Sequence, residues 1–126
     1  IDEIHENYDI QSIYIDPWAS AAFINMLKTE YMEYLIFCRQ GFATMSTLTT
    51  ETEKLILSGN LIHPNNPVLN WNIENMVLDI DGAGNVKPSK KKSISKIDGA
   101  VATIMAIGGC YAETKIEDSP ADILFL

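Results

Sequence analysis

The chain has 126 residues, of which 47% are hydrophobic and 21% are charged, and its net charge is −8 at neutral pH. This length and apolar content suit one domain with a hydrophobic core and exclude a disordered polar chain. The excess of acids argues against indiscriminate binding to nucleic acid, which depends on clustered lysine and arginine. No apolar run is long enough to cross a bilayer or act as a signal peptide, and the first residue is not methionine, so we expect a piece of a larger soluble protein without a membrane role.

The first forty residues predict a strand, a helix and a second strand. Residues 1–9 carry apolar side chains at helical spacing and predict the end of an amphipathic helix. Residues 10–15 predict a buried strand and residues 19–31 a helix with one apolar stripe. A second strand is expected over residues 34–38. Strands that alternate with helices are typical of a parallel α/β core, which is the fold class we expect.

The middle of the chain predicts a helix, a turn region and a hairpin. Residues 47–58 predict a helix, and Gly59 stands just after its end, where glycine is favoured. Residues 63–71 are rich in asparagine and proline and are expected to form turns. Asp81-Gly82 lies between two apolar runs, so residues 77–87 are expected to form an antiparallel hairpin.

The last part of the chain predicts an apolar helix and a tail. Residues 97–107 are apolar on nearly every side, which predicts a helix packed on more than one face and places Asp98 close to the core. Residues 113–126 lose this periodicity and include a proline, so we expect a mobile or loosely docked tail after a domain that covers residues 1–112.

Two aspartates are the main candidates for a chemical role. Asp16 follows an apolar strand that Pro17 ends, and Asp98 stands in the first turn of an apolar helix. Carboxylates held on rigid elements suit Mg²⁺ or Mn²⁺, the cations that phosphoryl-transfer enzymes use. Each also has a structural interpretation, because aspartate before proline is a common turn residue and Ser95 with Asp98 has the spacing of a capping box. The pattern leaves both interpretations open.

A cluster of lysines precedes the second aspartate. Five of the nine basic residues fall within ten positions: Lys87, Lys90, Lys91, Lys92 and Lys96. Such a patch either receives a phosphate backbone or forms a solvated loop.

Trp18 and Trp71 are expected to pack in the core or at its rim, with base stacking as the second interpretation. Cys38 and Cys110 lack zinc-ligand spacing and are expected to be reduced core residues.

A series of short motifs runs through the chain in a fixed order. Together they resemble the C-terminal nuclease domain of the large terminase subunit of tailed bacteriophages and prophages, over residues 1 to about 112. The residues that carry the resemblance are Ile15-Asp16-Pro17-Trp18; Arg39-Gln40-Gly41 with Met45-Ser46; Leu55 to Gly59; His63 with Asn66-Pro67-Val68-Leu69 and Trp71; Asn75; Lys87-Pro88 with Lys90; and Lys96-Ile97-Asp98-Gly99 with Ala102.

The resemblance implies an RNase H-like nuclease fold of the α/β class, here a fragment that lacks the first antiparallel strands. It also implies two-metal hydrolysis of DNA by Mg²⁺ or Mn²⁺, with three acids as ligands. Asp16 matches the second acid and Asp98 the third, and the first acid is expected upstream of Ile1, so this fragment alone is expected to be inactive. The lysines that would meet the DNA backbone are Lys90, Lys91, Lys92 and Lys96.

Asp79, Asp81 and His63 are further candidates, and we favour a structural interpretation for each. Asp79 and Asp81 near the hairpin tip are expected to be exposed turn acids rather than further ligands. His63, between Ile62 and Pro64, is expected to be a hydrogen-bonded structural residue rather than a proton donor.

The partners implied by the resemblance are double-stranded DNA, the terminase ATPase domain, the small terminase subunit and the portal. The implied setting is the cytoplasm of the bacterial host, where the parent protein would cut concatemeric viral DNA during packaging. The apolar strand over residues 10–15 would be an edge in the fragment, which predicts a dimer. Two alternatives stay open: another RNase H-like nuclease such as an integrase or resolvase, and a non-catalytic module that binds the portal or another subunit.

Overall fold

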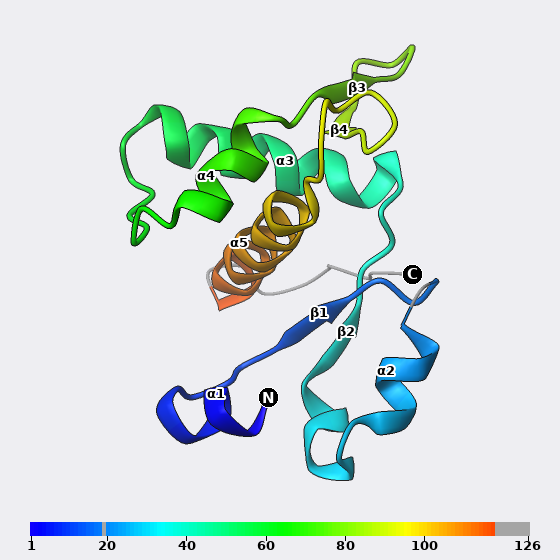
Figure 1. The fold of residues 1–126 in the computed structure, drawn as a ribbon, viewed down its shortest axis with the longest axis vertical. Helices are drawn as coiled ribbons and strands as arrows, with labels where there is room; N and C mark the ends of the chain where they lie inside the picture. The colour runs from blue at the N-terminus through cyan, green and yellow to red at the C-terminus, as the bar shows by residue number, and fades with distance from the viewer. Residues whose placement is uncertain (19, 118–126) are drawn as a thin grey trace. The chain divides into compact units, whose positions relative to one another are not determined.

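The computed structural model describes residues 1–18 and 20–117, which form two compact units (Figure 1). The N-terminal unit comprises residues 1–40, and the C-terminal unit begins at Gly41. Each unit has its own two-stranded sheet and its own helices.

The N-terminal unit contains a parallel pair of strands. Ile13 pairs with Leu35 and Ile15 with Phe37, and helical segments connect the two strands. This confirms the predicted strand, helix and parallel strand, although both strands are shorter than expected and β1 is half-buried rather than buried. The elements are α1 (Asp2–Asn7), β1 (Ile13–Ile15), α2 (Ala21–Met26), the 3₁₀ helix η1 (Thr29–Tyr34) and β2 (Leu35–Phe37).

The helix predicted over residues 19–31 is wrong in its extent, because the chain breaks into two helical segments. Leu27 and Lys28 both have extended backbone, with ψ angles of 136° and 145°. Lys28 and the buried Tyr31 then contact the same carboxylate: Lys28 Nζ lies 2.6 Å from Asp2 Oδ2, and the Tyr31 hydroxyl donates to Asp2 Oδ1 at 2.7 Å. These contacts with α1 favour the break over one continuous helix.

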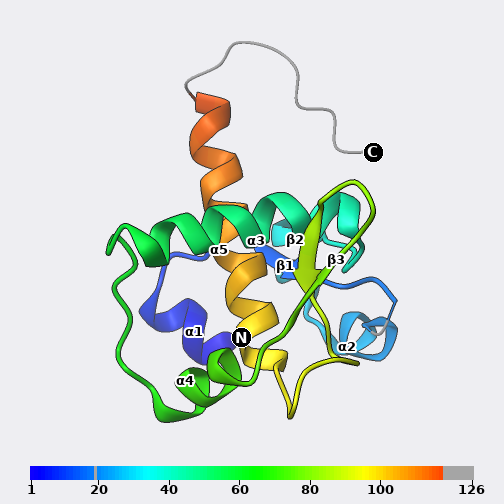
Figure 2. The same ribbon diagram turned by 90° about the horizontal axis from the view of Figure 1, so that it is seen from above.

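The C-terminal unit is built on three helices and a hairpin. α3 packs against α5 and β4, and α4 packs against α5. Figure 2 shows α3 lying across α5. The elements are α3 (Phe42–Leu57), α4 (Pro67–Glu74), β3 (Leu78–Ile80), β4 (Val86–Pro88) and α5 (Asp98–Glu117). The helix predicted over residues 47–58 is therefore confirmed, with an earlier start.

Helix α4 lies where the sequence predicted turns, and that prediction is wrong. Asn66 is its N-cap, and its side-chain oxygen accepts from the backbone amides of Val68 at 2.9 Å and Leu69 at 3.2 Å. Pro67 follows as the first helical residue, a position where its missing N–H costs nothing. The Asn-Pro pair that looked like a turn signal is a helix start.

The hairpin of β3 and β4 confirms the predicted antiparallel reversal. Leu78 pairs with Pro88 and Ile80 with Val86. Asp81 Oδ1 accepts from the backbone amides of Ala83 and Asn85, both at 2.9 Å. Bonds from Asn85 are the main reason that the pKa of Asp81 lies below its ordinary value. Asp81 is therefore a turn residue, as the sequence favoured.

The core of the C-terminal unit includes Met45 from α3 and Ile97, which precedes α5. Gly108 of α5 lies so close to α3 that a Cβ atom there would stand 2.6 Å from the Cβ of Leu48. The two helices therefore meet at a position that a larger residue would not fit.

Helix α5 continues to Glu117, so the boundary predicted at residue 112 falls within the helix. The rest of the predicted tail, residues 118–126, lies outside the described residues.

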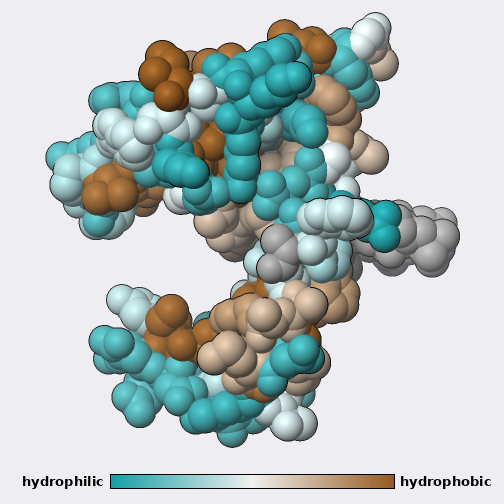
Figure 3. Space-filling view, turned by 45° about the vertical axis from the view of Figure 1, so that its right-hand side comes forward, coloured by the Kyte–Doolittle hydropathy of each residue, from teal (hydrophilic) through white to brown (hydrophobic). Residues whose placement is uncertain are grey.

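Among the helices of the described part, none has both the length and the hydropathy needed to span a bilayer. Exposed apolar side chains include Ile62 and Ile94, and Figure 3 shows brown patches separated by hydrophilic side chains on the face in view.

Candidate functional site

Asp16 lies directly after β1, where its carboxylate is held by a local turn. Its Oδ1 accepts from the backbone amide of Trp18 at 3.0 Å, across Pro17. The structural interpretation of this Asp-Pro step is thus confirmed for one carboxylate oxygen. Burial raises the pKa of the Cys38 thiol, and the charge of Asp16 adds a smaller effect. The turn fixes a carboxylate at the end of a strand, which is also what a ligand position requires.

The aromatic and cysteine expectations are only partly confirmed. Trp18 is 94% exposed, so the expectation that it packs in the core or rim is wrong, whereas Trp71 is 45% exposed and fits a rim position. Cys38 is buried as predicted, but Cys110 is exposed, because it falls on an outward-facing position of α5.

Asp98 is the first residue of α5, and its side chain is 66% exposed. The expectation that it lies close to the core is therefore wrong. Ile97, Ala100 and Val101 are buried, and this helical spacing turns Asp98 outward. The apolar residues next to Asp98 in the sequence are buried themselves, but Asp98 is not.

Two lysines lower the pKa of the Asp98 carboxyl. Lys90 Nζ lies 2.6 Å from Asp98 Oδ1. This bond holds the pKa of Asp98 below its ordinary value, and the charge of Lys96 adds a smaller effect. Asp98 is therefore ionised at neutral pH, the form in which a carboxylate binds a cation.

The start of α5 is fixed by a buried amide from α4. Asn72 Oδ1 accepts from the backbone amide of Gly99 at 2.9 Å, and its Nδ2 donates to the Val68 carbonyl at 2.9 Å. Sequence reasoning missed this residue, which lay in a segment without a clear helical prediction. The Asn-Pro start of α4 would have placed Asn72 on a helix.

Two lysines of the predicted patch form ion pairs with carboxylates, and two line a cavity. Lys92 forms an ion pair with Asp79 and lowers the pKa of that carboxyl, while Lys90 pairs with Asp98. A concave space of about 430 Å³ adjoins Asp98 and is lined by Lys90, Ser93, Ile94, Ser95, Lys96 and Ile97. Because exposed ion pairs contribute little stability, these lysines can exchange a carboxylate for another anion at small cost.

His63 and Asp79 each have a polar partner in the structure. His63 Nδ1 accepts from the backbone amide of Asn65 at 3.3 Å, where Asn65 has a φ of 54°. The hydrogen bond expected of His63 is therefore confirmed. Asp79 lies within β3 and its half-buried side chain forms an ion pair with Lys92, so the expectation of an exposed turn acid is wrong for this residue.

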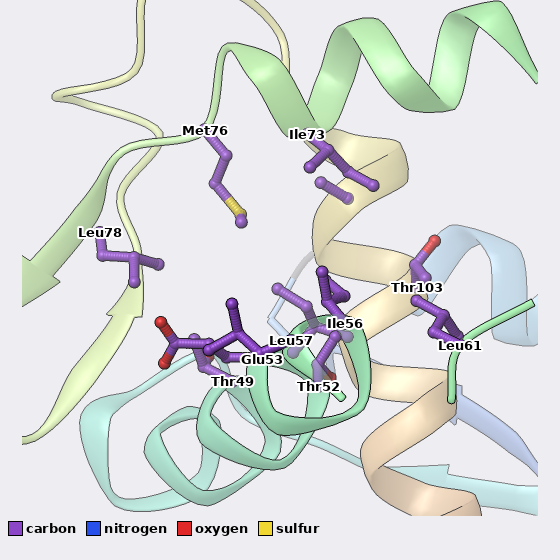
Figure 4. Close-up of a pocket in the computed structure, with 12 residues that line it drawn as sticks. Thr49, Thr52, Glu53, Ile56, Leu57, Leu61, Ile73, Met76, Leu78 and Thr103 are labelled. Atoms are coloured by element: carbon purple, nitrogen blue, oxygen red, sulfur yellow. The ribbon is translucent and has the colours of Figure 1, made fainter. Parts of the chain in front are cut away.

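A second concavity lies among α3, α4 and α5, and it is almost wholly apolar. Figure 4 shows Ile73 and Met76 facing Ile56 and Leu57 across it. Its volume is about 260 Å³. Neither Asp16 nor Asp98 lines it, and no sequence motif predicted it.

The acids have the chemistry of Mg²⁺ or Mn²⁺ ligands, but they are too few to complete a site. Asp16 belongs to the N-terminal unit and Asp98 to the C-terminal unit. Within residues 1–18 and 20–117, no group of three or more histidine, cysteine, aspartate or glutamate side chains is placed to hold a metal ion. Each carboxylate is a suitable oxygen donor on a rigid element, and further ligands are required.

Residues 1–113 match the family described as terminase large subunit, endonuclease domain. The match includes strand β1, which Asp16 follows directly, and the helix that begins at Asp98. The chain belongs to this family, as the sequence motifs predicted.

Two curated relatives and one solved structure are similar to the chain. The chain is 37% identical over 110 residues to Protein YmfN of Escherichia coli (strain K12), covering 86% of this chain and 24% of that protein. It is 33% identical over 114 residues to the terminase large subunit of Enterobacteria phage HK97, covering 90% of this chain and 23% of that protein. The crystal structure of the HK97 bacteriophage large terminase superposes with a TM-score of 0.74 at 32% identity, over 86% of this chain and 23% of that one. The chain thus spans about a quarter of the length of these relatives.

Proposed function

We propose that this chain is the C-terminal part of an RNase H-like, metal-dependent DNA endonuclease that cuts concatemeric viral DNA during genome packaging. The observation that carries the proposal is Asp98. It is an exposed, ionised carboxylate at the start of a rigid helix, beside a lysine-lined cavity, inside the region that matches the endonuclease family. The TM-score of 0.74 with the HK97 terminase supports the proposed fold.

In this proposal Asp16 and Asp98 contribute to a two-metal site for Mg²⁺ or Mn²⁺. The first acid would come from a preceding part of the parent protein. When bound, the cations supply a water of lowered pKa and stabilise the leaving oxygen of the phosphodiester. The carboxylates contribute charge and fixed positions, Asp16 from its turn and Asp98 from the helix start.

The lysines of the chain orient the DNA backbone. Lys90 and Lys96 line the cavity next to Asp98, so a phosphate entering it meets two ammonium groups. Lys90 must then exchange its bond to Asp98 for one to the phosphate. Lys91 and Lys92 extend the basic surface. Contacts of this kind position the duplex and do not read its sequence.

The partners in the proposal are double-stranded DNA, the ATPase domain and small subunit of terminase, and the portal, in the cytoplasm of the bacterial host. The N-terminal unit offers a place for the preceding strands. Its sheet has two strands in the described residues, β1 and β2, so each retains an edge. In the parent protein we propose that the first strands pair there, and in the 126-residue chain alone the edge would favour a dimer.

The family match favours terminase over an integrase or resolvase. A non-catalytic module that binds the portal or another subunit remains the second candidate. One observation favours it: Asp16 Oδ1 already accepts a turn hydrogen bond. The two candidates differ in what they require of Asp98.

Cleavage by matched variants of the parent terminase subunit tests the proposal. Asp98→Asn is expected to lower DNA cleavage at least about a hundredfold, since it removes a metal ligand, and to leave the melting temperature almost unchanged. Asp79→Asn is the control, because Asp79 is likewise an aspartate paired with a lysine of the same loop. Normal cleavage by Asp98→Asn would overturn the endonuclease role of this residue and favour the non-catalytic module.

A further inference from the structure

Asn72 is a buried polar side chain that connects two helices beside the candidate metal ligand. It is 6% exposed and lies on α4. Its Nδ2 donates to the Val68 carbonyl within its own helix, and its Oδ1 accepts from the Gly99 amide of α5, both at 2.9 Å. Both ends of the amide are therefore engaged, and the group is fixed in orientation. Such a bridge links the position of α5 to that of α4.

The first turn of α5 needs an acceptor from elsewhere. A helix leaves the amides of its first turn without partners inside the helix. In α5 the Val101 amide donates to the Ile97 carbonyl at 3.0 Å. The Gly99 amide stands two residues earlier, so it has no acceptor within the helix. Ile97 is apolar and almost fully buried, so its side chain cannot accept a hydrogen bond. Asn72 supplies the acceptor that a serine or aspartate at the N-cap would otherwise provide.

Gly99 leaves the space that this contact requires. A Cβ atom at this position would lie 3.3 Å from Asn72 Oδ1, a tighter approach than an ordinary van der Waals contact. The glycine thus allows the side-chain oxygen of Asn72 to approach the backbone of α5. The residue directly before this glycine is Asp98.

We propose that Asn72 is a positioning residue for Asp98: by holding the Gly99 amide, it determines where α5 begins and therefore where the Asp98 carboxylate stands. The inference rests on the proposed role of Asp98 as a metal ligand. Without the bridge the first turn of α5 frays, and Asp98 loses its fixed relation to Lys90. A misplaced ligand of this kind weakens a metal site although every ligand is still present.

A structural role alone would make a different prediction. If Asn72 only joins α4 to α5, its loss lowers stability and leaves the local geometry at Asp98 unchanged. NMR of the metal-free 126-residue chain separates the two, through hydrogen exchange of the Gly99 amide and the titration of the Asp98 carboxyl carbon. Asn72→Leu keeps the approximate size of the side chain and removes both hydrogen bonds.

Thr52→Val is the matched control. Thr52 is 5% exposed, and its hydroxyl donates to the Leu48 carbonyl at 2.8 Å, within α3. It therefore loses a buried hydrogen bond on another helix of the same unit. Gly99→Ala is a second test variant that retains Asn72 and crowds its oxygen, which serves if Asn72→Leu does not fold.

The expected result is local. In Asn72→Leu, exchange of the Gly99 amide accelerates at least tenfold relative to amides in the middle of α5, and the Asp98 titration moves up toward the ordinary carboxyl range. Gly99→Ala changes both in the same direction by a smaller amount, and Thr52→Val changes neither. Wild-type values of both readouts in the two test variants would overturn the positioning role.

Addition of Mn²⁺ then separates this inference from the proposed function. In the parent terminase subunit, which would supply the further ligands, paramagnetic broadening at Asp98 and its neighbours is expected in the wild type and in Thr52→Val, with at least a tenfold higher Mn²⁺ concentration needed in Asn72→Leu. Absence of broadening at Asp98 in the wild-type parent subunit would overturn its metal role and the inference with it. Equal broadening in wild type and Asn72→Leu, together with altered exchange at Gly99, would leave the metal role intact and overturn the inference alone.

Discussion

The two candidate ligands stand on different kinds of support. Asp16 follows a strand of three residues, and its own turn holds it through the Trp18 amide. Asp98 begins a helix of twenty residues whose first turn is tied to α4 by Asn72. The position of Asp16 thus depends on residues within two places of it in the sequence, and that of Asp98 on a residue of another helix.

The C-terminal unit also buries more apolar side chains than the N-terminal unit. Among the described residues, the buried hydrophobic side chains of the N-terminal unit are Tyr31 and Cys38, whereas those of the C-terminal unit are Met45, Ile97, Ala100, Val101, Ile104 and Met105. A larger buried apolar surface contributes more stability. We therefore expect the C-terminal unit to hold Asp98 rigidly and the N-terminal unit to depend more on what pairs with its sheet edge.

The largest expected effect comes from Gly108→Ala in the C-terminal unit. The added Cβ would lie 2.5 Å from Leu48 Cδ2 and 2.6 Å from its Cβ, so the helices must move apart. A loss of about 1–3 kcal/mol in the free energy of unfolding is expected for such overpacking, measured by chemical denaturation. Gly82→Ala is the control, because no atom lies within 4 Å of its added Cβ. Equal stability of the two variants would contradict the close approach of α3 and α5.

A smaller effect is expected from Tyr31→Phe in the N-terminal unit. The change removes the hydroxyl that donates to Asp2 Oδ1 at 2.7 Å from a nearly buried ring. A loss of about 1 kcal/mol is typical for such a bond. Hydrogen exchange should show faster exchange in residues 1–40 and little change in α3 and α5. Equal acceleration in both units would contradict the difference in packing.

The smallest effect is expected from Lys90→Met, and it concerns the pKa of Asp98. Lys90 keeps the pKa of Asp98 below the ordinary 3.8, so the carboxylate contributes stability above that pH and loses it as the pH falls through the lower, folded-state value. Lys90→Met should therefore raise the pKa of Asp98, as followed by carbon NMR. Lys92→Met is the matched control and should instead raise the pKa of Asp79. An unchanged Asp98 titration in Lys90→Met would show that the ion pair does not persist in solution.

Local signals in the sequence predicted much of the fold. The hairpin followed from Asp81-Gly82, and the parallel pair followed from two apolar runs around a helix. The prediction was wrong where one residue type has two uses: Asn66-Pro67 begins α4 and does not form a turn. It was also wrong where distant contacts decide, as at Leu27 and Lys28, because the Asp2 carboxylate that binds Lys28 and Tyr31 lies far away in the sequence.

The candidate site shows the same limit. The choice of Asp16 and Asp98 followed from the motifs, but the exposure of Asp98 depends on which side of α5 faces its neighbours. The contact of Asn72 with Gly99 joins residues 27 positions apart, which no local pattern indicates. The roles of Asp16, Asp98 and the lysines in metal and DNA binding stay predictions.

The most direct test of the account is a crystal structure of the parent terminase subunit soaked in Mn²⁺, with the anomalous map read at Asp16 and Asp98. The account predicts anomalous density at about 2.1 Å from an oxygen of each carboxylate, in one shared two-metal site. Carboxylates held apart in their own turns, with no anomalous density between them, would contradict it.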